Sequence, residues 1–102
     1  MTSAEHKTLD ELRREIDRLD EMLLEVLAAR SARVAAVGAL KAAHGIPVFS
    51  AARERGKRAA FRHRAEARGL DPDWAEDFLR MVMAAARDAQ SRGGAPRATL
   101  RP

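Results

Sequence analysis

Apolar residues recur every three or four positions along the N-terminal part of the chain, which is the spacing of one face of an α-helix. From Leu9 to about Lys41 the sequence contains no proline and a single glycine, Gly38. Thr8 or Asp10 is suited to cap the start of such a helix. The apolar positions are Leu9, Leu12, Ile16, Leu19, Leu23, Val26, Val34 and Val37. We therefore predict one long amphipathic helix over this segment.

Two further helices are predicted between recognisable start and stop signals. The segment His44-Gly45-Ile46-Pro47 ends the first helix, because glycine accepts a left-handed cap and proline disfavours helix in the residue before it. Ser50 then caps a second helix with a weak apolar face, which runs to about Arg68 and is closed by Gly69. Asp71-Pro72-Asp73 combines a cap, a first-turn proline and a first-turn acid at the start of a third helix. This third helix carries Trp74, Phe78, Val82 and Ala85 at core spacing.

These elements place the chain in the all-α class, with three helices in one domain of residues 1–92. The third helix stops near Ser91, and residues 93–102 are expected to form a flexible tail. At ~1.5 Å per residue the first helix is about 50 Å long, whereas a compact domain of about 100 residues has a radius of gyration of about 13 Å. The remaining chain is too short to cover the apolar stripe, so we expect a homodimer joined through this helix.

Composition narrows the setting and the class of partner. The chain has no cysteine, no hydrophobic run near the ~18 residues of a membrane span and no basic-then-apolar leader, so we expect a cytoplasmic protein without a membrane partner. Its net charge of +4 is modest, acidic residues are interspersed among the arginines, and no nucleic-acid motif is present. We therefore do not expect general nucleic-acid binding. The histidines have neither ligand spacing nor neighbouring ligands, so no metal is assigned.

Two cations, Arg30 and Lys41, interrupt the apolar face of the first helix. An unpaired cation on a buried face is costly. Their separation is about 20° from three full turns, so both point the same way and lie roughly 16 Å apart along the axis. Such a pair can bind an anion, and it can equally consist of snorkelling side chains or of ion pairs with carboxylates.

Arg13 lies on a different side of the first helix, about 100° around from Arg30 and roughly 25 Å away along the axis. The two side chains of one chain therefore cannot share a small pocket. In an antiparallel dimer, however, Arg13 of the partner subunit can approach Arg30. Taken alone, Arg13 is consistent with ordinary surface charge.

Two more polar positions carry candidate chemistry. Arg53-Glu54 lies in the first turn of the second helix, where the helix dipole stabilises a carboxylate but not an arginine. Gln90 places a neutral donor at the end of an apolar stripe on the third helix. The stripe consists of Leu79, Met83 and Ala86. Alone, these positions are consistent with surface charge and with a helix end.

Several fragments of the sequence together match a known family, although each is weak alone. They are Leu12-Arg13-x-x-Ile16-x-x-Leu19-Asp20-x-x-Leu23-Leu24, Leu27-Ala28-x-Arg30, Val34-x-x-Val37-Gly38-x-x-Lys41, Pro47-Val48 and Arg53-Glu54. With these fragments the chain resembles the all-helical chorismate mutases from about Leu9 to Gln90. It is most similar to the mutase domain fused to prephenate dehydrogenase in bifunctional enzymes of the tyrosine pathway.

The resemblance implies an intertwined homodimer of three-helix subunits with two equivalent sites. Each site is completed by one arginine from the first helix of the partner subunit, and Arg13 occupies that position. By the same resemblance, Arg13 and Arg30 bind the two carboxylates of chorismate. Lys41 and Gln90 donate hydrogen bonds to the ether oxygen whose bond breaks.

Of the remaining site positions, some match the residues that are usual in this family and two differ from them. The resemblance implies that Glu54 holds the ring hydroxyl of the substrate and that Arg53 supports the site. Ser50 stands where an aspartate often helps to hold that hydroxyl, and Ala86 stands where a serine often helps to bind a carboxylate. Ser50 can still cap its helix and present a hydroxyl, and Ala86 leaves room for a water molecule.

The implied function is that of a chorismate mutase, which rearranges chorismate to prephenate in phenylalanine and tyrosine biosynthesis. This pericyclic reaction needs no nucleophile and no cofactor. Two enzymes on the same scaffold are the nearest alternatives: an isochorismate pyruvate lyase and a mutase acting on 4-amino-4-deoxychorismate. Arg53-Glu54 and Gln90 favour the ordinary mutase. An alternative from another class is a helical dimer that binds proteins or RNA through its arginines.

Overall fold

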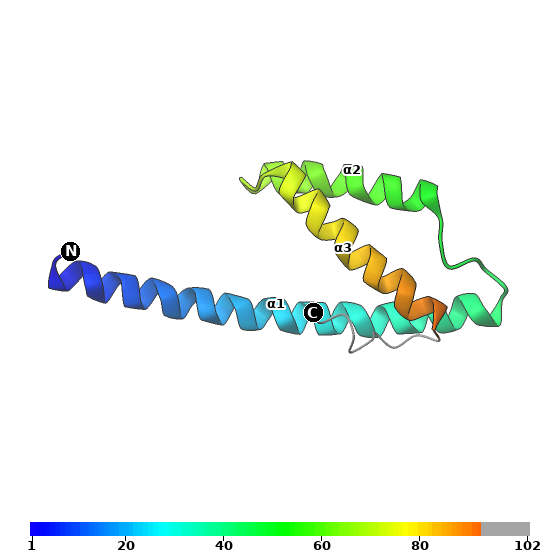
Figure 1. Cartoon of the computed structure of the whole chain (residues 1–102), viewed down its shortest axis with the longest axis horizontal. Coiled ribbons are helices and arrows are strands. Elements are labelled where there is room, and N and C mark those ends of the chain that lie inside the picture. Colours follow the sequence, from blue (N-terminus) through cyan, green and yellow to red (C-terminus); the bar gives the residue numbers. More distant parts are fainter. Residues whose placement is uncertain (93–102) are drawn as a thin grey trace. The chain divides into compact units, whose positions relative to one another are not determined.

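The computed structural model describes residues 1–92, which form three α-helices and no strand (Figure 1). They are α1 (Ser3–Ala43), α2 (Ala51–Ala67) and α3 (Pro72–Ser91), so the predicted all-α class is confirmed. The tail predicted over residues 93–102 lies outside the described residues. The chain divides into two compact units, Met1–Arg30 and the part that begins at Ser31, and each is described by itself. No helix in the described residues combines the length and hydropathy needed to cross a membrane.

The start of α1 lies further upstream than the sequence predicted. The backbone amide of Thr2 donates to Glu5 Oε1 (2.9 Å), and the amide of Glu5 donates to Thr2 Oγ1 (3.1 Å). This reciprocal pair is a capping box, which satisfies two amides that a helix start leaves without partners. Thr8, one of the predicted caps, instead donates its hydroxyl to the carbonyl of Ala4 (3.1 Å) within the helix. The prediction was wrong because it took the first residue of the apolar repeat, Leu9, as the helix start.

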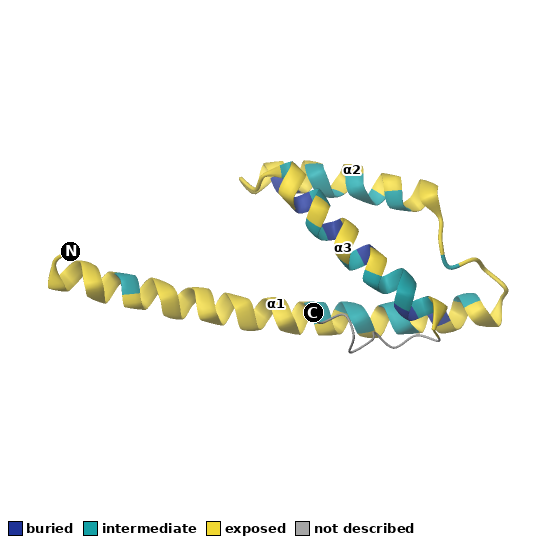
Figure 2. Cartoon of the chain, in the orientation of Figure 1, coloured by how far each residue is buried: buried dark blue, intermediate teal, exposed yellow. Residues whose placement is uncertain are grey.

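The apolar stripe of the unit Met1–Arg30 is exposed (Figure 2). Five of its members leave between 48% and 63% of their surface open to solvent. They are Leu12, Ile16, Leu19, Leu23 and Val26. An apolar face of this kind is more typical of a protein interface than of a surface that faces water.

The core of the second unit lies mainly on α3, which contacts α2, and most of the residues drawn as buried are on α3 (Figure 2). Its buried apolar residues are Ala65, Ala75, Leu79, Met83 and Ala89. The residues predicted at core spacing fall on the adjacent face instead. Trp74 is 60% exposed and stacks on Phe78, with ring centroids 6.1 Å apart, while Phe78, Val82 and Ala85 are half-buried. Both faces of α3 are apolar, and the small side chains of Ala65 and Ala75 suit the closer approach of two helices.

The caps of α2 and α3 confirm the predicted helix starts. Ser50 Oγ accepts a hydrogen bond from the backbone amide of Arg53 (3.3 Å), and Asp71 Oδ1 accepts one from the amide of Asp73 (2.9 Å). Gly45 after α1 and Gly69 after α2 have φ values of 65° and 74°, in the left-handed region that glycine adopts without strain. These local signals set where the chain reverses direction.

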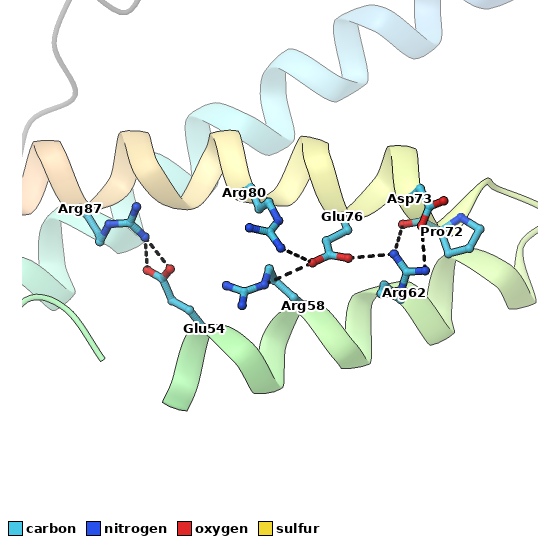
Figure 3. Close-up of polar contacts among 8 residues, drawn as sticks. All are labelled: Glu54, Arg58, Arg62, Pro72, Asp73, Glu76, Arg80 and Arg87. Atoms are coloured by element: carbon cyan, nitrogen blue, oxygen red, sulfur yellow. Dashed lines mark hydrogen bonds and ion pairs between the residues drawn. The ribbon is translucent and has the colours of Figure 1, made fainter. Parts of the chain in front are cut away.

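An ion-pair cluster centred on Glu76 joins α2 to α3 (Figure 3). The Glu76 carboxylate pairs with Arg58 (3.3 Å) and Arg62 (2.8 Å) of α2 and with Arg80 (2.9 Å) of its own helix. Arg62 also pairs with Asp73 (2.8 Å). Hydrogen bonds from Arg80 and Arg62 hold the pKa of the Glu76 carboxyl below its ordinary value. The cluster therefore stabilises the helix pair when Glu76 is ionised.

Glu76→Gln is expected to lower the free energy of unfolding at neutral pH and to lose this effect in acid. Because the pKa of Glu76 is lower in the folded chain, its contribution is present above the ordinary glutamate pKa and disappears as pH falls through the folded value. Urea midpoints of both proteins should therefore differ at about pH 7 and converge as the pH falls through the pKa of Glu76 in the folded chain. Glu66→Gln, at an exposed carboxylate of α2, is the control. A gap that does not change as the pH is lowered would show that the ionised cluster does not stabilise the fold.

Candidate active site

Lys41 is held at the end of α1 by the loop that follows it. Its Nζ donates a hydrogen bond to the carbonyl oxygen of Val48 (2.9 Å), and the side chain is half-buried. The loop turns back toward this point because the amide of Ile46 donates to the Lys41 carbonyl (2.9 Å). An ammonium group has three protons, so Lys41 retains donors for a ligand after this bond is made. The cation predicted from the apolar stripe is thus anchored rather than extended into solvent.

Gln90 is anchored in a similar way, at the point where α3 meets α1. Its Nε2 donates to the carbonyl oxygen of Val34 (3.2 Å). Gly38, the buried residue of α1, lies against it: a Cβ placed at Gly38 would be 3.0 Å from Gln90 Cγ. This close approach explains why a glycine stands inside a helix, where it costs about 1 kcal/mol relative to alanine. An amide group has two protons, so Gln90 also keeps one for a ligand.

Glu54 is paired with Arg87, a residue that the sequence analysis did not single out. Both carboxylate oxygens of Glu54 accept a hydrogen bond from Arg87 Nη1 (Figure 3). The Arg87 guanidinium also lies over the ring of Phe49, with Cζ 5.1 Å from the ring centroid. Only 16% of the Glu54 side chain is exposed. A weak signal for Arg87 was available, since it lies one turn before Gln90 on α3.

Side-chain contacts and short stretches of chain connect the three residues predicted to be catalytic, Lys41, Glu54 and Gln90. Lys41 donates a hydrogen bond to Val48, and the next residue, Phe49, lies beneath the Arg87 guanidinium. Arg87 in turn binds Glu54. Gln90 lies one turn after Arg87 on α3. It contacts α1 at Gly38, one turn before Lys41, and at Val34. The second unit therefore holds an anchored cation, an anchored amide and an arginine-paired carboxylate, one on each of three helices.

The other predicted residues of the second unit have mixed placements. Ser50 uses its hydroxyl oxygen to cap α2, as predicted. Arg53 is exposed and lines an open hollow along α2 together with Lys57 and Arg64, and no contact shows the supporting role expected of it in the site. Ala86 is half-buried on α3, directly before Arg87.

Arg13 and Arg30 belong to the unit Met1–Arg30. Arg13 is exposed and Arg30 is half-buried, as expected for a cation set into an apolar stripe. The binding of carboxylates by these two arginines stays a prediction. Within residues 1–92, no three histidine, cysteine, aspartate or glutamate side chains are grouped so as to hold a metal ion.

Comparison with known proteins covers nearly the whole described region. The model of the family described as chorismate mutase type II matches residues 12–91, a range that contains every predicted site residue. The T-protein of Enterobacter agglomerans is 45% identical over 75 residues, which are 74% of this chain and 20% of that protein. The T-protein of Haemophilus influenzae is 40% identical over 77 residues, which are 76% of this chain and 20% of that protein.

The chain thus spans about one fifth of the length of these curated relatives. The family resemblance drawn from the sequence fragments is confirmed by the family match. The family model matches residues 12–91, and the described residues form three helices and no strand. This chain belongs to the chorismate mutase type II family.

Proposed function

We propose that this chain catalyses the rearrangement of chorismate to prephenate, a step in the biosynthesis of phenylalanine and tyrosine. Membership of the chorismate mutase type II family supports the substrate class. The observation that carries the proposal is the anchoring of Lys41 and Gln90 by the backbone carbonyls of Val48 and Val34. Two donors oriented before the substrate arrives suit a reaction that places negative charge on one ether oxygen.

The rearrangement breaks a carbon–oxygen bond and forms a carbon–carbon bond within one molecule. It requires no nucleophile, no obligatory proton transfer and no cofactor, so the enzyme acts by holding a reactive conformation and stabilising charge. In the proposed mechanism Arg13 and Arg30 each bind one carboxylate of chorismate, for which the planar guanidinium is well suited. Lys41 and Gln90 donate to the ether oxygen as its bond lengthens. Glu54 accepts a hydrogen bond from the ring hydroxyl.

An intertwined homodimer is part of the proposal. The exposed apolar stripe of α1 supports it, because a partner helix would remove this surface from water. Each site would then contain Arg13 of the partner subunit beside the other residues of one chain. A cytoplasmic location is also proposed, with no metal, membrane or nucleic acid as partner.

Because of the two departures from the family pattern, Glu54 would be the main acceptor of a hydrogen bond from the ring hydroxyl. The hydroxyl oxygen of Ser50 already accepts the hydrogen bond that caps α2. Ala86 has no polar group, so a carboxylate near it would be bound by a water molecule rather than by a hydroxyl. Arg53 would act at the edge of the site through its charge.

The proposed function is tested by adding chorismate to the purified chain, following the loss of its ultraviolet absorbance and identifying the product. Prephenate as the product supports the proposal. Pyruvate released from isochorismate would identify a lyase, and turnover confined to 4-amino-4-deoxychorismate would identify the amino-substrate mutase. If none of the three compounds is converted, the chain is not this enzyme, and a helical module that binds protein or RNA becomes the better interpretation.

Gly38→Ala is expected to separate fold stability from catalysis. The new methyl group would force Gln90 to move by a few tenths of an ångström, which disturbs its bond to Val34. The free energy of unfolding should change by less than about 1 kcal/mol, because the higher helix propensity of alanine offsets the crowding. Turnover should fall about tenfold through the displaced amide.

The measurement pairs chorismate kinetics with urea unfolding of the same protein. Gly56→Ala, in α2 where an added Cβ meets no atom within 4 Å, is the matched control and should keep wild-type turnover. Wild-type turnover in Gly38→Ala as well would show that the crowding does not reach the Gln90 amide.

A further inference from the structure

Arg87 is a charged residue beside the candidate site to which the family resemblance assigns no role. Its Nη1 contacts both oxygens of Glu54, across from α3 to α2 (Figure 3). Its guanidinium lies over the ring of Phe49. The residue before Phe49 is Val48, whose carbonyl oxygen anchors Lys41. Arg87 thus contacts two elements of the site at once, while 37% of its own side chain remains exposed.

The charge at this position matters because the proposed substrate is a dianion. A carboxylate without a partner beside such a substrate would repel it. Arg87 places a positive charge against Glu54 and offsets this repulsion. Each carboxylate oxygen carries two lone pairs, so Glu54 can bind Arg87 and still accept a hydrogen bond from a hydroxyl.

The Phe49 contact adds geometric control to the charge. A guanidinium that stacks on an aromatic ring has fewer orientations than one in water, and the interaction contributes at exposed and partly buried sites alike. Because Arg87 is held by Phe49 and Glu54 is held by Arg87, the direction of the remaining carboxylate lone pairs is restricted. A free glutamate side chain would have to lose that rotational freedom when the substrate binds.

We propose that Arg87 is a positioning residue that orients Glu54 to accept the ring hydroxyl of the substrate and cancels its charge. This inference rests on the proposed function, since it assigns the recognition of one substrate group within that reaction. It makes Arg87 a determinant of specificity for a ring that carries a hydrogen-bond donor. The loss caused by replacing Arg87 should therefore be much larger on a ring that carries this donor than on a ring that lacks it, where only the effect on charge remains.

The test compares Arg87→Met and Arg87→Lys with the wild-type chain on two substrates, chorismate and an analogue that lacks the ring hydroxyl. Methionine keeps much of the side-chain length but removes the charge and the donors. On chorismate, Arg87→Met should lower kcat/KM about tenfold or more, since a displaced group is costly in a preorganised site. On the analogue, Arg87→Met should lose no more than about threefold, because Glu54 has no hydroxyl to orient toward and only the uncompensated charge of Glu54 remains.

Arg87→Lys keeps the positive charge but not the fork geometry, so it should fall between wild type and Arg87→Met on chorismate. It also serves if Arg87→Met unfolds, because it retains an ion pair with Glu54. Combining Arg87→Met with Glu54→Gln should cost little more than Glu54→Gln alone, since the two residues act as one unit. Arg80→Met removes an arginine of α3 that pairs with Glu76 instead, and it should keep wild-type kinetics on both substrates.

Equal losses in Arg87→Met on both substrates would overturn the role proposed for Arg87, and so would losses that add to those of Glu54→Gln. In either case, turnover of chorismate by the wild-type chain would still support the mutase function. A wild-type chain that converts neither compound overturns the mutase function and the role of Arg87 with it. Selective loss on chorismate, with recovery in Arg87→Lys, supports the inference.

Discussion

Lys41→Ala is expected to lower kcat for chorismate by a factor of about 100 to 1,000 while the chain keeps its helices. The ether oxygen gains negative charge in the transition state, and a fixed cation beside it stabilises that state more than the bound substrate. The anchoring of Nζ by the Val48 carbonyl means that the charge is oriented before the reaction begins. Removing the lysine therefore removes an interaction for which water is a poor substitute.

The fold should tolerate the change because Lys41 makes a single described hydrogen bond to the chain, worth about 1–2 kcal/mol. Circular dichroism and urea unfolding would show whether the helices and their stability persist. Lys7→Ala, at an exposed lysine near the start of α1, is the matched control. If Lys41→Ala stays within a few-fold of wild type, Lys41 takes no part in the reaction.

Arg13→Ala and Arg30→Ala should each be nearly inactive, and a mixture of the two should recover about one quarter of wild-type activity. In each homodimer of a single mutant, every site lacks one carboxylate clamp. In a mixed dimer, one site draws Arg30 from the first mutant and Arg13 from the second and is whole, while the other site lacks both. Random pairing makes about half of the dimers mixed, and half of their sites are whole.

The two mutants must be unfolded together and refolded, because the proposed intertwined dimer is expected to exchange subunits slowly. Mixing Arg30→Ala with Lys41→Ala is the control: both residues are proposed to serve the same site from one chain, so each site of that mixed dimer lacks one of them. That mixture should stay inactive. Verified mixed dimers of Arg13→Ala and Arg30→Ala without recovery would show that the two arginines do not meet across the interface.

The helices themselves could largely be predicted from the sequence, because their boundaries depend on local physics. Ser50 and Asp71 cap the helices that follow them, and Gly45 and Gly69 take positive φ where the sequence placed the turns. The start of α1 escaped prediction for a local reason too. The capping box of Thr2 lies ahead of the apolar repeat, and a pattern search over apolar residues does not extend that far.

The packing of α3 was predicted only in part. Two neighbouring stripes on this helix are apolar, one with Trp74 and Phe78 and one with Leu79 and Met83. Periodicity identifies both stripes, but the choice between them depends on the shape of the surface that α2 offers. The structure buries the second stripe and leaves Trp74 exposed.

For the candidate site, the sequence by itself determined which chemical groups are available. The sequence fragments that contain Arg13, Arg30, Lys41 and Arg53-Glu54 together indicated the family by resemblance, and the comparison confirms it. Helical spacing showed in addition that Arg30 and Lys41 share one face of the first helix. No contact between helices is needed to recognise them.

Only the tertiary structure decided how these groups are held. The pairing of Glu54 with Arg87 joins residues 33 positions apart, and the bond from Gln90 to Val34 joins residues 56 positions apart. Gly38 is explained only by the Gln90 side chain that crosses it. Such contacts depend on how helices far apart in the chain approach one another, and helical periodicity within a single segment carries no information about that approach.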